Sequence, residues 1–531
     1  MSDLLILSIT IPLGMALLIA ILPRKMPEWP AKALALAGFA LPALFSIQVF
    51  LSYFREGDGG FLYQRVIPTG LDQSLGIALR IGVNGISVVL LLLAAIVGLA
   101  AGWAAIVSNA ERKRTYLVLL LIMFSGLLGI FSTYDIFYLY FFHEVALIPS
   151  FIMIAIWGGP NRRPAAMNMT VYLTLGAMVS LAGLIGIYVG SGLGSFDLIS
   201  LSEHLASQPF ATTLGQTLFG LLLFGLGILV SLFPFHSWAP LGYTAAPTSV
   251  AMLHAGVLKK FGLYTLIQVG LPLLGSAAFR WTDTLSVLAL GNIIIIGLIT
   301  MAQRDLKQMI SYASVMHMGY IFLGIATVSM LGAGGAVFLM LAHGLSVAAL
   351  FHLATAIQHR CRTFNMEEMG GLGKEAPVLC GLFMTAMLAS IGLPGFANFW
   401  GEFTVFASIW QWKPLVLVIA LTGIVISAIY GLRAVAKTFF GQPTEAFREI
   451  RTRHLVSDIG WAERIPAVIL LIALLIFGLI PHWAGNPVEK AIAGIWQKQS
   501  DLNFTGQRLD VRDAGSLIAP DEEVKEEAPQ P

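Results

Sequence analysis

Few ionisable side chains lie inside the long apolar stretches of this 531-residue chain, and two of them are a carboxylate and an amine. Glu144 stands in the middle of the run 140–149, and Lys260 follows Lys259 in the run 258–264. A charge at the centre of a bilayer costs ~2.5 kcal/mol or more, so such residues are candidates for a functional role. Apolar surroundings favour the neutral form of both groups, which allows each to take up and release a proton. We predict that Glu144 and Lys260 carry protons, with a structural ion pair between helices as the alternative.

Two histidines stand in similar surroundings. His317 lies in the segment 315–320 and His343 in the segment 341–346, each flanked by small or hydroxyl residues. Imidazole both accepts and donates a proton, which suits a relay between other titratable groups. The alternative for each is a hydrogen-bonded core histidine without a functional role. Lys259 is a further candidate, although its long side chain could instead extend toward the membrane surface.

The remaining histidines and the cysteines argue against a bound cofactor. His352 and His359 are seven residues apart on one helical face, but one helix cannot supply both axial ligands of a haem, and His359 belongs to a basic loop. Cys361 and Cys380 are nineteen residues apart, and the chain contains no Cys-x-x-Cys motif. This spacing excludes iron–sulfur and c-type haem ligation. We therefore expect neither a cofactor nor a metal in this chain.

The chain that must position these residues has the composition of a membrane protein. Hydrophobic residues make up 57% and charged residues 11%, far from the roughly half apolar and quarter charged mixture of a soluble domain. Apolar runs of about twenty residues, each long enough to cross a ~30 Å hydrocarbon core, recur from end to end. We predict an all-α, polytopic membrane domain over residues 1–500 and a polar, disordered tail over 501–531. The fourteen predicted spans are 4–23, 31–54, 86–108, 115–132, 135–157, 166–190, 214–238, 248–269, 282–303, 305–330, 333–358, 376–409, 415–440 and 465–482.

Two of the predicted spans contain helix breakers. Pro234 lies in the segment 232–238 and Pro394 in the segment 391–402. Interrupted apolar segments at corresponding positions of two halves indicate inverted repeats around a transport path. We predict two inverted five-helix repeats, made of the fourth to eighth and the ninth to thirteenth spans. A proline break also frees backbone carbonyls that require water or side-chain partners, although an ordinary proline kink would leave the same pattern.

Several motifs occur in order along the chain, and together they resemble one family. They include Phe-Phe-His-Glu-Val-Ala-Leu-Ile-Pro at 141–149 and Gly-Leu-Pro-Gly-Phe-Ala-Asn-Phe-Trp-Gly-Glu-Phe at 392–403. The others lie at 233–238, 246–250, 256–260, 305–307, 314–319, 342–346 and 369–372. Over about residues 80–440 the chain is similar to the antiporter-like membrane subunits of proton-pumping NADH:quinone oxidoreductase (respiratory complex I), and most closely to their M type.

This resemblance implies a fourteen-helix subunit of a translocating enzyme, without a redox site or cofactor of its own. NADH and quinone would be used by other subunits of the complex. The partners would be neighbouring antiporter-like subunits and the lipid bilayer of the inner (cytoplasmic) membrane, and no nucleic acid. Glu144, Lys260, His317 and His343 fall on the family's positions for a chain of buried proton carriers. Glu402, in the Gly-Glu-Phe pattern of the M type, falls on the position of the outlet residue.

One departure from the family pattern concerns the partner of Glu144. Family members usually carry a lysine five residues before the Pro-Phe-His motif, as the partner of the mid-helix glutamate, and this chain has Leu229 there. Glu144 therefore lacks its expected cation, and an unpaired buried carboxylate is held in its neutral form. The candidates for a substitute are His143, His236 and His254. His143 starts about 100° away round the same helix, so we favour the facing helices, and His254 over His236.

Other functions are compatible with the same residues. Subunits of multi-subunit cation/proton antiporters and of membrane-bound hydrogenases share the fold and much of the motif set. A scaffold subunit that no longer conducts ions is a different class of function. The leucine at position 229, where family members usually have a lysine, is consistent with that function. No sequence feature distinguishes the proton from sodium as the transported ion.

The distribution of lysine and arginine predicts the orientation of the chain. With the N-terminus outside, nineteen of the 31 lysines and arginines fall in cytoplasmic loops, and ten fall in external loops and the tail. The remaining two are Lys259 and Lys260 within a span. Positive residues are enriched on the cytoplasmic side of membrane proteins. We predict that both termini are extracytoplasmic.

Cysteine labelling tests this orientation at Lys25, in a predicted cytoplasmic loop, and at Ser108, the cytoplasmic end of the predicted span 86–108. We expect a membrane-impermeant maleimide to label Lys25→Cys and Ser108→Cys only from the cytoplasmic face of the membrane. Labelling from the external face would contradict the topology.

Overall fold

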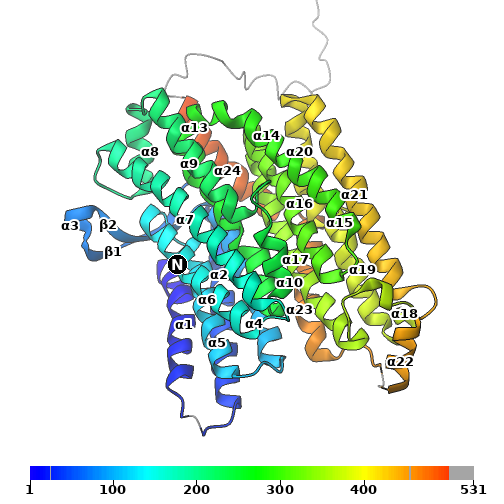
Figure 1. The fold of residues 1–531 in the computed structure, drawn as a ribbon. Coiled ribbons are helices and arrows are strands. Elements are labelled where there is room, and N and C mark those ends of the chain that lie inside the picture. Colours follow the sequence, from blue (N-terminus) through cyan, green and yellow to red (C-terminus); the bar gives the residue numbers. More distant parts are fainter. Residues whose placement is uncertain (24, 454–455, 501–531) are drawn as a thin grey trace, which may run out of the picture.

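The chain folds into a bundle of long helices that run between two opposite ends of the molecule (Figure 1). The structure is a computed structural model that describes residues 1–23, 25–453 and 456–500. The tail predicted over 501–531 lies outside the described residues. The helical, polytopic membrane architecture predicted from composition is confirmed.

Long helices make up the bundle, and we describe it in two parts that follow the chain, before and after the segmented helix. The first part contains α1 (Ser2–Ile21), α2 (Trp29–Glu56), α4 (Gly85–Val107), α5 (Lys113–Ile130), α6 (Ile136–Trp157), α7 (Arg162–Ser191) and α9 (Thr212–Val230). A segmented helix follows, built from α11 (Thr248–Leu253), η1 (His254–Leu258), α12 (Lys260–Thr265), η2 (Leu266–Gly270) and α13 (Leu271–Ala278). The second part contains α14 (Thr282–Gly291), η4 (Asn292–Ile296), α15 (Gly297–Ala302), α16 (Leu306–Ala326), α17 (Met330–Cys361), α19 (Pro377–Ile391), α20 (Ala397–Trp412), α21 (Pro414–Phe439) and α23 (Trp461–Leu479). The remaining elements are β1 (Leu62–Leu71), α3 (Asp72–Leu75), β2 (Ile77–Val83), α8 (Leu198–Ser207), α10 (Trp238–Ala245), η3 (Phe279–Trp281), η5 (Met366–Glu368), α18 (Leu372–Glu375), α22 (Glu445–Arg453) and α24 (His482–Ser500).

Among the described residues, twelve helices are long and apolar enough to cross a membrane. One of them, Thr248–Ala302, covers two of the predicted spans, and the predicted span 376–409 is divided between α19 and α20. Each predicted span therefore has a helical counterpart, whereas the count of fourteen and the two inverted repeats remain predictions. The hairpin of β1 and β2 and the helix α24 were not predicted, because both segments are too polar to read as membrane spans.

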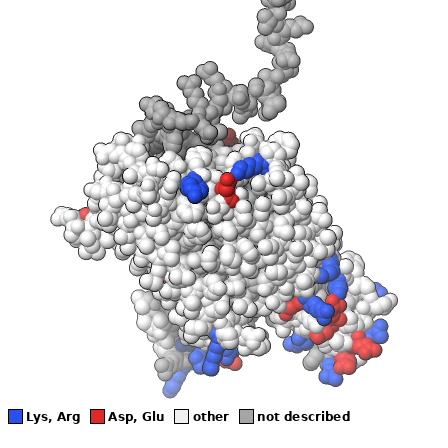
Figure 2. Space-filling view, turned by 45° about the horizontal axis from the view of Figure 1, so that its top comes forward, with Lys and Arg blue, Asp and Glu red and all other residues white. Residues whose placement is uncertain are grey.

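The degree of burial separates central helices from peripheral ones. The most apolar windows of α16 and α17 are 94% and 100% buried, whereas those of α1 and α21 are each 33% buried. A helix that is apolar on all sides belongs inside a bundle or against lipid. On the face shown in Figure 2, most charged side chains gather toward one end of the molecule, and the side of the bundle between the ends is largely uncharged. The helices that carry His317 and His343 are thus the central ones.

Two helices are interrupted at prolines. Pro234 lies in the gap between α9 and α10, and Pro394 lies in the gap between α19 and α20. The first gap is fixed by the buried amide of Asn292, whose nitrogen donates to the carbonyl oxygens of Ser231 (3.0 Å) and Val315 (2.9 Å). The first break is therefore tied to α16 two residues before His317.

The hairpin projects from the side of the bundle (Figure 1) and is held by the residues that precede α6. Arg80 of β2 forms an ion pair with Asp135, whose side chain is fully buried. The Arg80 carbonyl also accepts hydrogen bonds from the Thr133 hydroxyl (2.8 Å) and the Tyr134 N–H (3.2 Å). Asp135 in turn caps α6 by accepting from its first backbone N–H groups. One carboxylate thus joins the hairpin to the helix that carries Glu144.

Arg80→Gln tests this attachment. The change leaves the Asp135 carboxylate buried without its cation, which typically costs about 3–5 kcal/mol. We expect a lower midpoint of thermal unfolding in detergent and faster proteolysis of the hairpin. The control is Arg65→Gln, because Arg65 and Asp3 pair at the surface with side chains 50% and 74% exposed, where a pair contributes about 0–1 kcal/mol. Equal destabilisation by the two variants would contradict the anchoring role.

Candidate functional site

Lys260 and His343 form a hydrogen-bonded pair at the centre of the bundle. The Nζ atom of Lys260, in α12, lies 2.8 Å from Nδ1 of His343, in α17, and both side chains are buried. The helices approach this closely because two glycines face each other: a Cβ atom on Gly344 would stand 2.6 Å from the carbonyl oxygen of Gly256. In such a contact one nitrogen donates and the other accepts. The pair can therefore pass a proton from one nitrogen to the other.

His317, in α16, is the next buried titratable group. Its Nδ1 atom lies 2.8 Å from the carbonyl oxygen of Ala313, which can only accept, so the proton of the neutral ring is assigned to Nδ1. The other nitrogen, Nε2, is buried and makes no well-aligned hydrogen bond in the part of the chain that the structure describes, although the backbone of Ser390 lies beside the ring. The His317 ring centroid is 5.7 Å from that of His343 and 6.0 Å from that of Tyr320. His317 thus presents an acceptor nitrogen beside the Lys260–His343 pair.

Glu402 is buried near the start of α20, against the second break. A Cβ atom on Gly392 would lie 2.3 Å from Oε2 of Glu402, and Gly392 has a φ of +88°, so both the contact and the backbone require glycine. No residue within the described ranges donates a hydrogen bond to this carboxyl group. Tyr320 and Tyr430 lie close enough to interact electrostatically with Glu402. The carboxyl group therefore lies against a glycine turn and within electrostatic range of two tyrosines.

Two polar side chains that the sequence did not single out connect these groups. The amide nitrogen of Asn398 lies 3.4 Å from the hydroxyl oxygen of Ser346, which itself donates to the backbone carbonyl of His343. Asn398 precedes Glu402 by four residues, and Ser346 follows His343 by three, so each lies one helical turn from a predicted proton carrier. This one-turn spacing is the sequence signal that could have identified Ser346 and Asn398. We call the resulting set of buried side chains the polar row: Lys260, His343, His317, Ser346, Asn398 and Glu402.

Glu144 lies apart from the polar row. Its side chain is 31% exposed, and Nδ1 of His143 is 3.2 Å from its Oε1 atom. The expectation of a buried, unpaired carboxylate is therefore wrong, and so is the preference for His254 over His143 as its neighbour. Adjacent positions start 100° apart on a helix, but the glutamate side chain is long enough to reach back to the imidazole. The buried His143 ring stacks on Phe261 of α12 at 4.0 Å, which holds the ring in place.

The other auxiliary candidates lie in three different surroundings. His236 is in the first break, where its ring stacks on Phe233 at 5.8 Å. His254 is fully enclosed at the start of η1. Lys259 is buried as well, and its Nζ atom donates to the hydroxyl (3.1 Å) and carbonyl (3.3 Å) oxygens of Ser314. The Lys259 side chain therefore points into the bundle and does not extend to the membrane surface.

The histidines considered for haem have a structural role at the edge of the bundle. Nε2 of His352 donates to the carbonyl oxygen of Glu463 at 2.7 Å, and Nδ1 of His359 lies 3.5 Å from the Oε1 atom of the same residue. These contacts fasten α17 to α23. Cys361 and Cys380 are free thiols. Within residues 1–23, 25–453 and 456–500, no group of three or more His, Cys, Asp or Glu side chains is placed to hold a metal ion.

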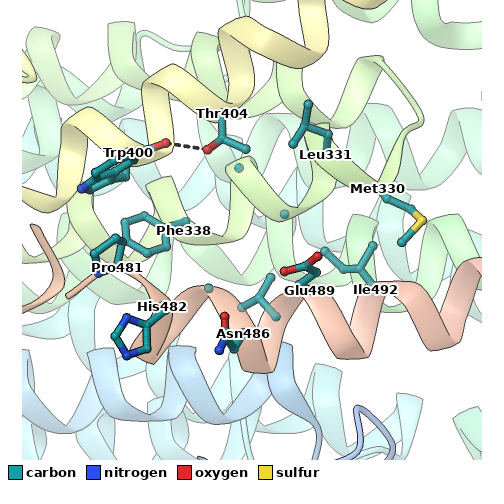
Figure 3. A pocket seen from close by; sticks show the side chains of 14 residues that line it. Met330, Leu331, Phe338, Trp400, Thr404, Pro481, His482, Asn486, Glu489 and Ile492 are labelled. Atoms are coloured by element: carbon teal, nitrogen blue, oxygen red, sulfur yellow. Dashed lines mark hydrogen bonds between the residues drawn. The ribbon is translucent and has the colours of Figure 1, made fainter. Parts of the chain in front are cut away.

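Two cavities lie at opposite ends of the bundle. The first, of about 410 Å³, is bounded by α17, α20 and α24 (Figure 3). Trp400 and Thr404 line it, whereas Glu402, two residues from each, lies on the opposite side of α20. The second cavity, of about 370 Å³, is lined in part by Tyr116 and Ser249. The first cavity is thus separate from the polar row, and the second begins at the start of α11.

The chain is similar to several known membrane proteins. A family model described as "NADH:quinone oxidoreductase/Mrp antiporter, TM" matches residues 133–427. NADH-quinone oxidoreductase subunit M of Rickettsia felis is 34% identical over 436 residues, which are 82% of this chain and 87% of that protein. NAD(P)H-quinone oxidoreductase chain 4 1 of Picosynechococcus sp. is 31% identical, over 90% of this chain and 89% of that protein.

Solved structures show the same architecture. A chain in the structure of respiratory complex I from Thermus thermophilus with bound NADH matches with a TM-score of 0.83 at 26% identity, covering 93% of this chain and 99% of that chain. A chain of the Mrp complex from Dietzia sp. matches with a TM-score of 0.81, covering 94% of this chain and 98% of that chain. At 19% identity, the second match shows a shared fold alone.

Gly392→Ala tests the position of the Glu402 carboxyl group. A left-handed backbone costs a non-glycine residue about 1–2 kcal/mol, and the new methyl group must also displace the carboxyl oxygen. We expect proton translocation by the assembled protein in vesicles to fall. Gly441→Ala is the control, because Gly441 has a φ of +78° with nothing within 4 Å of an added Cβ atom. An equal loss in both variants would show that only backbone strain matters.

Proposed function

Because this chain belongs to the NADH:quinone oxidoreductase/Mrp antiporter family of transmembrane proteins, we propose that it is a proton-translocating membrane-arm subunit of an NADH:quinone oxidoreductase-type complex. The polar row carries this proposal, since titratable side chains from Lys260 to Glu402 occupy the buried centre of the bundle. NADH and quinone react in other subunits, and neighbouring antiporter-like subunits adjoin this one. The subunit lies in the inner (cytoplasmic) membrane with both termini extracytoplasmic.

The first step of the relay is transfer between Lys260 and His343. An N–H bond of the lysine ammonium breaks and a bond to Nδ1 of His343 forms, which leaves a neutral amine and an imidazolium. The imidazolium then releases its other proton toward Nε2 of His317, directly or through one water molecule. Because Ala313 retains the Nδ1 proton of His317, Nε2 is the atom that takes up and gives up the moving proton.

Glu402 receives the proton at the second break. Tyr320 lies beside His317 and within electrostatic range of Glu402, and Asn398, which is bonded to Ser346, stands one helical turn before Glu402. Their polar atoms are suited to order water along the path. Pro394 removes a backbone hydrogen bond and frees carbonyl oxygens, so this part of the helix can be hydrated. The neutral glutamic acid then loses its proton to water on the extracytoplasmic side.

The residue types favour a proton over a sodium ion as the transported species. Hard cations require several oxygen ligands. The polar row instead contains two imidazoles and an amine, which bind protons, and only one carboxylate. A cation/proton antiporter subunit and a scaffold subunit remain the alternatives, and a scaffold predicts that no residue of the polar row affects pumping.

Glu144 has a different role from the polar row. Glu144 is partly exposed at the surface of the subunit, and its carboxylate contacts the buried imidazole of His143. We propose that this pair responds to the charge of the neighbouring membrane subunit. The missing lysine at Leu229 then affects communication between subunits more than proton transfer within the polar row.

Glu402→Gln in the assembled complex tests the proposed function. The carboxamide keeps the size and hydrogen bonding of the side chain but cannot titrate, so we expect proton translocation to fall by roughly tenfold or more. The measurement is the number of protons moved per NADH oxidised in reconstituted vesicles. Glu489→Gln is the matched control, because Glu489 is exposed in the cavity of Figure 3 and lies outside the polar row. Normal pumping by the Glu402→Gln variant would refute the role.

A further inference from the structure

A second buried amine and an imidazole stand close together outside the polar row. His254 is 1% exposed, and neither of its ring nitrogens has a hydrogen-bond partner in the described part of the chain. Lys259 is 2% exposed, and among the described residues its Nζ atom bonds only to neutral oxygen atoms of Ser314. A buried polar group without a partner costs about 1–3 kcal/mol, so its presence calls for an explanation beyond packing.

The backbone is arranged to put these two side chains on one side of the helix. In a regular α-helix, positions five apart are separated by roughly 140°, because each residue turns the helix by 100°. Here the segment η1 is a π-turn, and the Lys259 N–H donates to the carbonyl oxygen of His254 at 3.1 Å. This i→i+5 bond brings Lys259 closer to the side of the helix that carries His254 than a regular α-helix would. Single π-turns of this kind occur frequently at functional sites.

Tyr243 joins the two side chains. Its ring centroid is 5.3 Å from that of His254, and the Nζ atom of Lys259 lies 5.2 Å from the same centroid. The face of an aromatic ring attracts a cation, so Tyr243 favours the charged form of the lysine without neutralising it. The hydroxyl of Tyr243 is itself buried and has no partner within the described residues. The three groups form a compact polar cluster in an apolar surrounding.

The cluster lies between a cavity and the polar row. Ser249, which lines the second cavity, is five residues before His254, which is roughly 7.5 Å along a helix axis. On the other side, Lys259 is close enough to interact electrostatically with Lys260, His317 and His343. The cluster thus stands where a proton that enters from the Ser249 cavity would reach the polar row.

We propose that His254 and Lys259 form a second proton-holding site that loads the Lys260–His343 pair. A proton from water binds a ring nitrogen of His254 and then passes to Nζ of Lys259, so one N–H bond breaks and another forms. Two neighbouring ammonium groups repel each other. A charged Lys259 therefore drives the proton of Lys260 onto His343 and starts the relay. The proton on Nζ of Lys259 then moves to the neutral amine of Lys260, directly or through one water molecule, so that Lys259 is again a neutral acceptor and the pair is reloaded. This inference rests on the proposed function.

Lys259→Met in the assembled complex tests the proposal. Methionine keeps a long, flexible side chain but cannot hold a proton. We expect a loss of protons moved per NADH oxidised in reconstituted vesicles, at an unchanged amount of assembled complex. Adding Leu229→Lys should restore part of the number of protons moved per NADH oxidised, because Leu229 is buried at the end of α9 near the same cluster. Its neighbour Ile228 accepts a hydrogen bond from Trp238 through its carbonyl oxygen. The Trp238 ring lies 5.7 Å from that of His254.

The matched control is Lys307→Met. Lys307 is also a buried lysine, its Nζ atom donates to the Ala246 carbonyl at 2.6 Å, and it lies over the ring of Phe364 at 5.6 Å. We expect this change to affect stability or assembly without altering the ratio in the complex that does assemble. Equal losses for Lys259→Met and Lys307→Met, without rescue by Leu229→Lys, would show a structural role and overturn the proposal.

His254→Phe provides the second variant should Lys259→Met fail to assemble, because it keeps an aromatic ring and removes only the titrating nitrogens. An unchanged ratio in either assembled variant overturns the proposal. Comparison with Glu402→Gln then separates a failure of the second proton-holding site from a failure of the proposed proton translocation. A loss in Glu402→Gln alone rejects only the second proton-holding site, and no loss in any of these variants rejects proton translocation by this subunit.

Discussion

The hydrogen bond between Lys260 and His343 exists because two helix backbones touch at Gly256 and Gly344. A side chain larger than hydrogen at either glycine would separate η1 from α17 and pull the two nitrogens apart. In a bilayer the apolar effect between helices is weak, so close backbone contact at small residues is a main source of helix packing. The contact that stabilises the centre of the bundle therefore also brings together the two groups that exchange a proton.

The two helix breaks help to position His317 and Glu402, the later members of the relay. At the first break, Asn292 bonds to Ser231 and to Val315, two residues before His317. At the second break, Gly392 receives the carboxyl group of Glu402. Each interruption thus fixes a titratable residue on a neighbouring helix, and backbone that would be costly against lipid is enclosed by protein.

The sequence predicted the positions of the helices, the two interruptions and most of the polar row. These features depend on composition, on proline and on charged residues in apolar runs, which are visible without tertiary information. The sequence did not predict that Glu144 would face outward beside His143, because side-chain direction on a helix depends on which neighbours pack against it. It also did not reveal the π-turn at His254–Leu258, since an inserted residue changes helix phase without a compositional signal. Ser346 and Asn398 were recognisable only by their one-turn spacing from His343 and Glu402.

In the proposed relay, the buried carboxyl group of Glu402 gains and loses a proton during turnover. Infrared difference spectroscopy of the assembled complex during NADH oxidation measures this directly through the carbonyl stretch of a protonated carboxyl group. We expect a carboxylic-acid band that changes with turnover, shifts in heavy water and is absent from Glu402→Gln. A difference spectrum in which Glu402→Gln removes no band would show that Glu402 does not change its protonation during turnover.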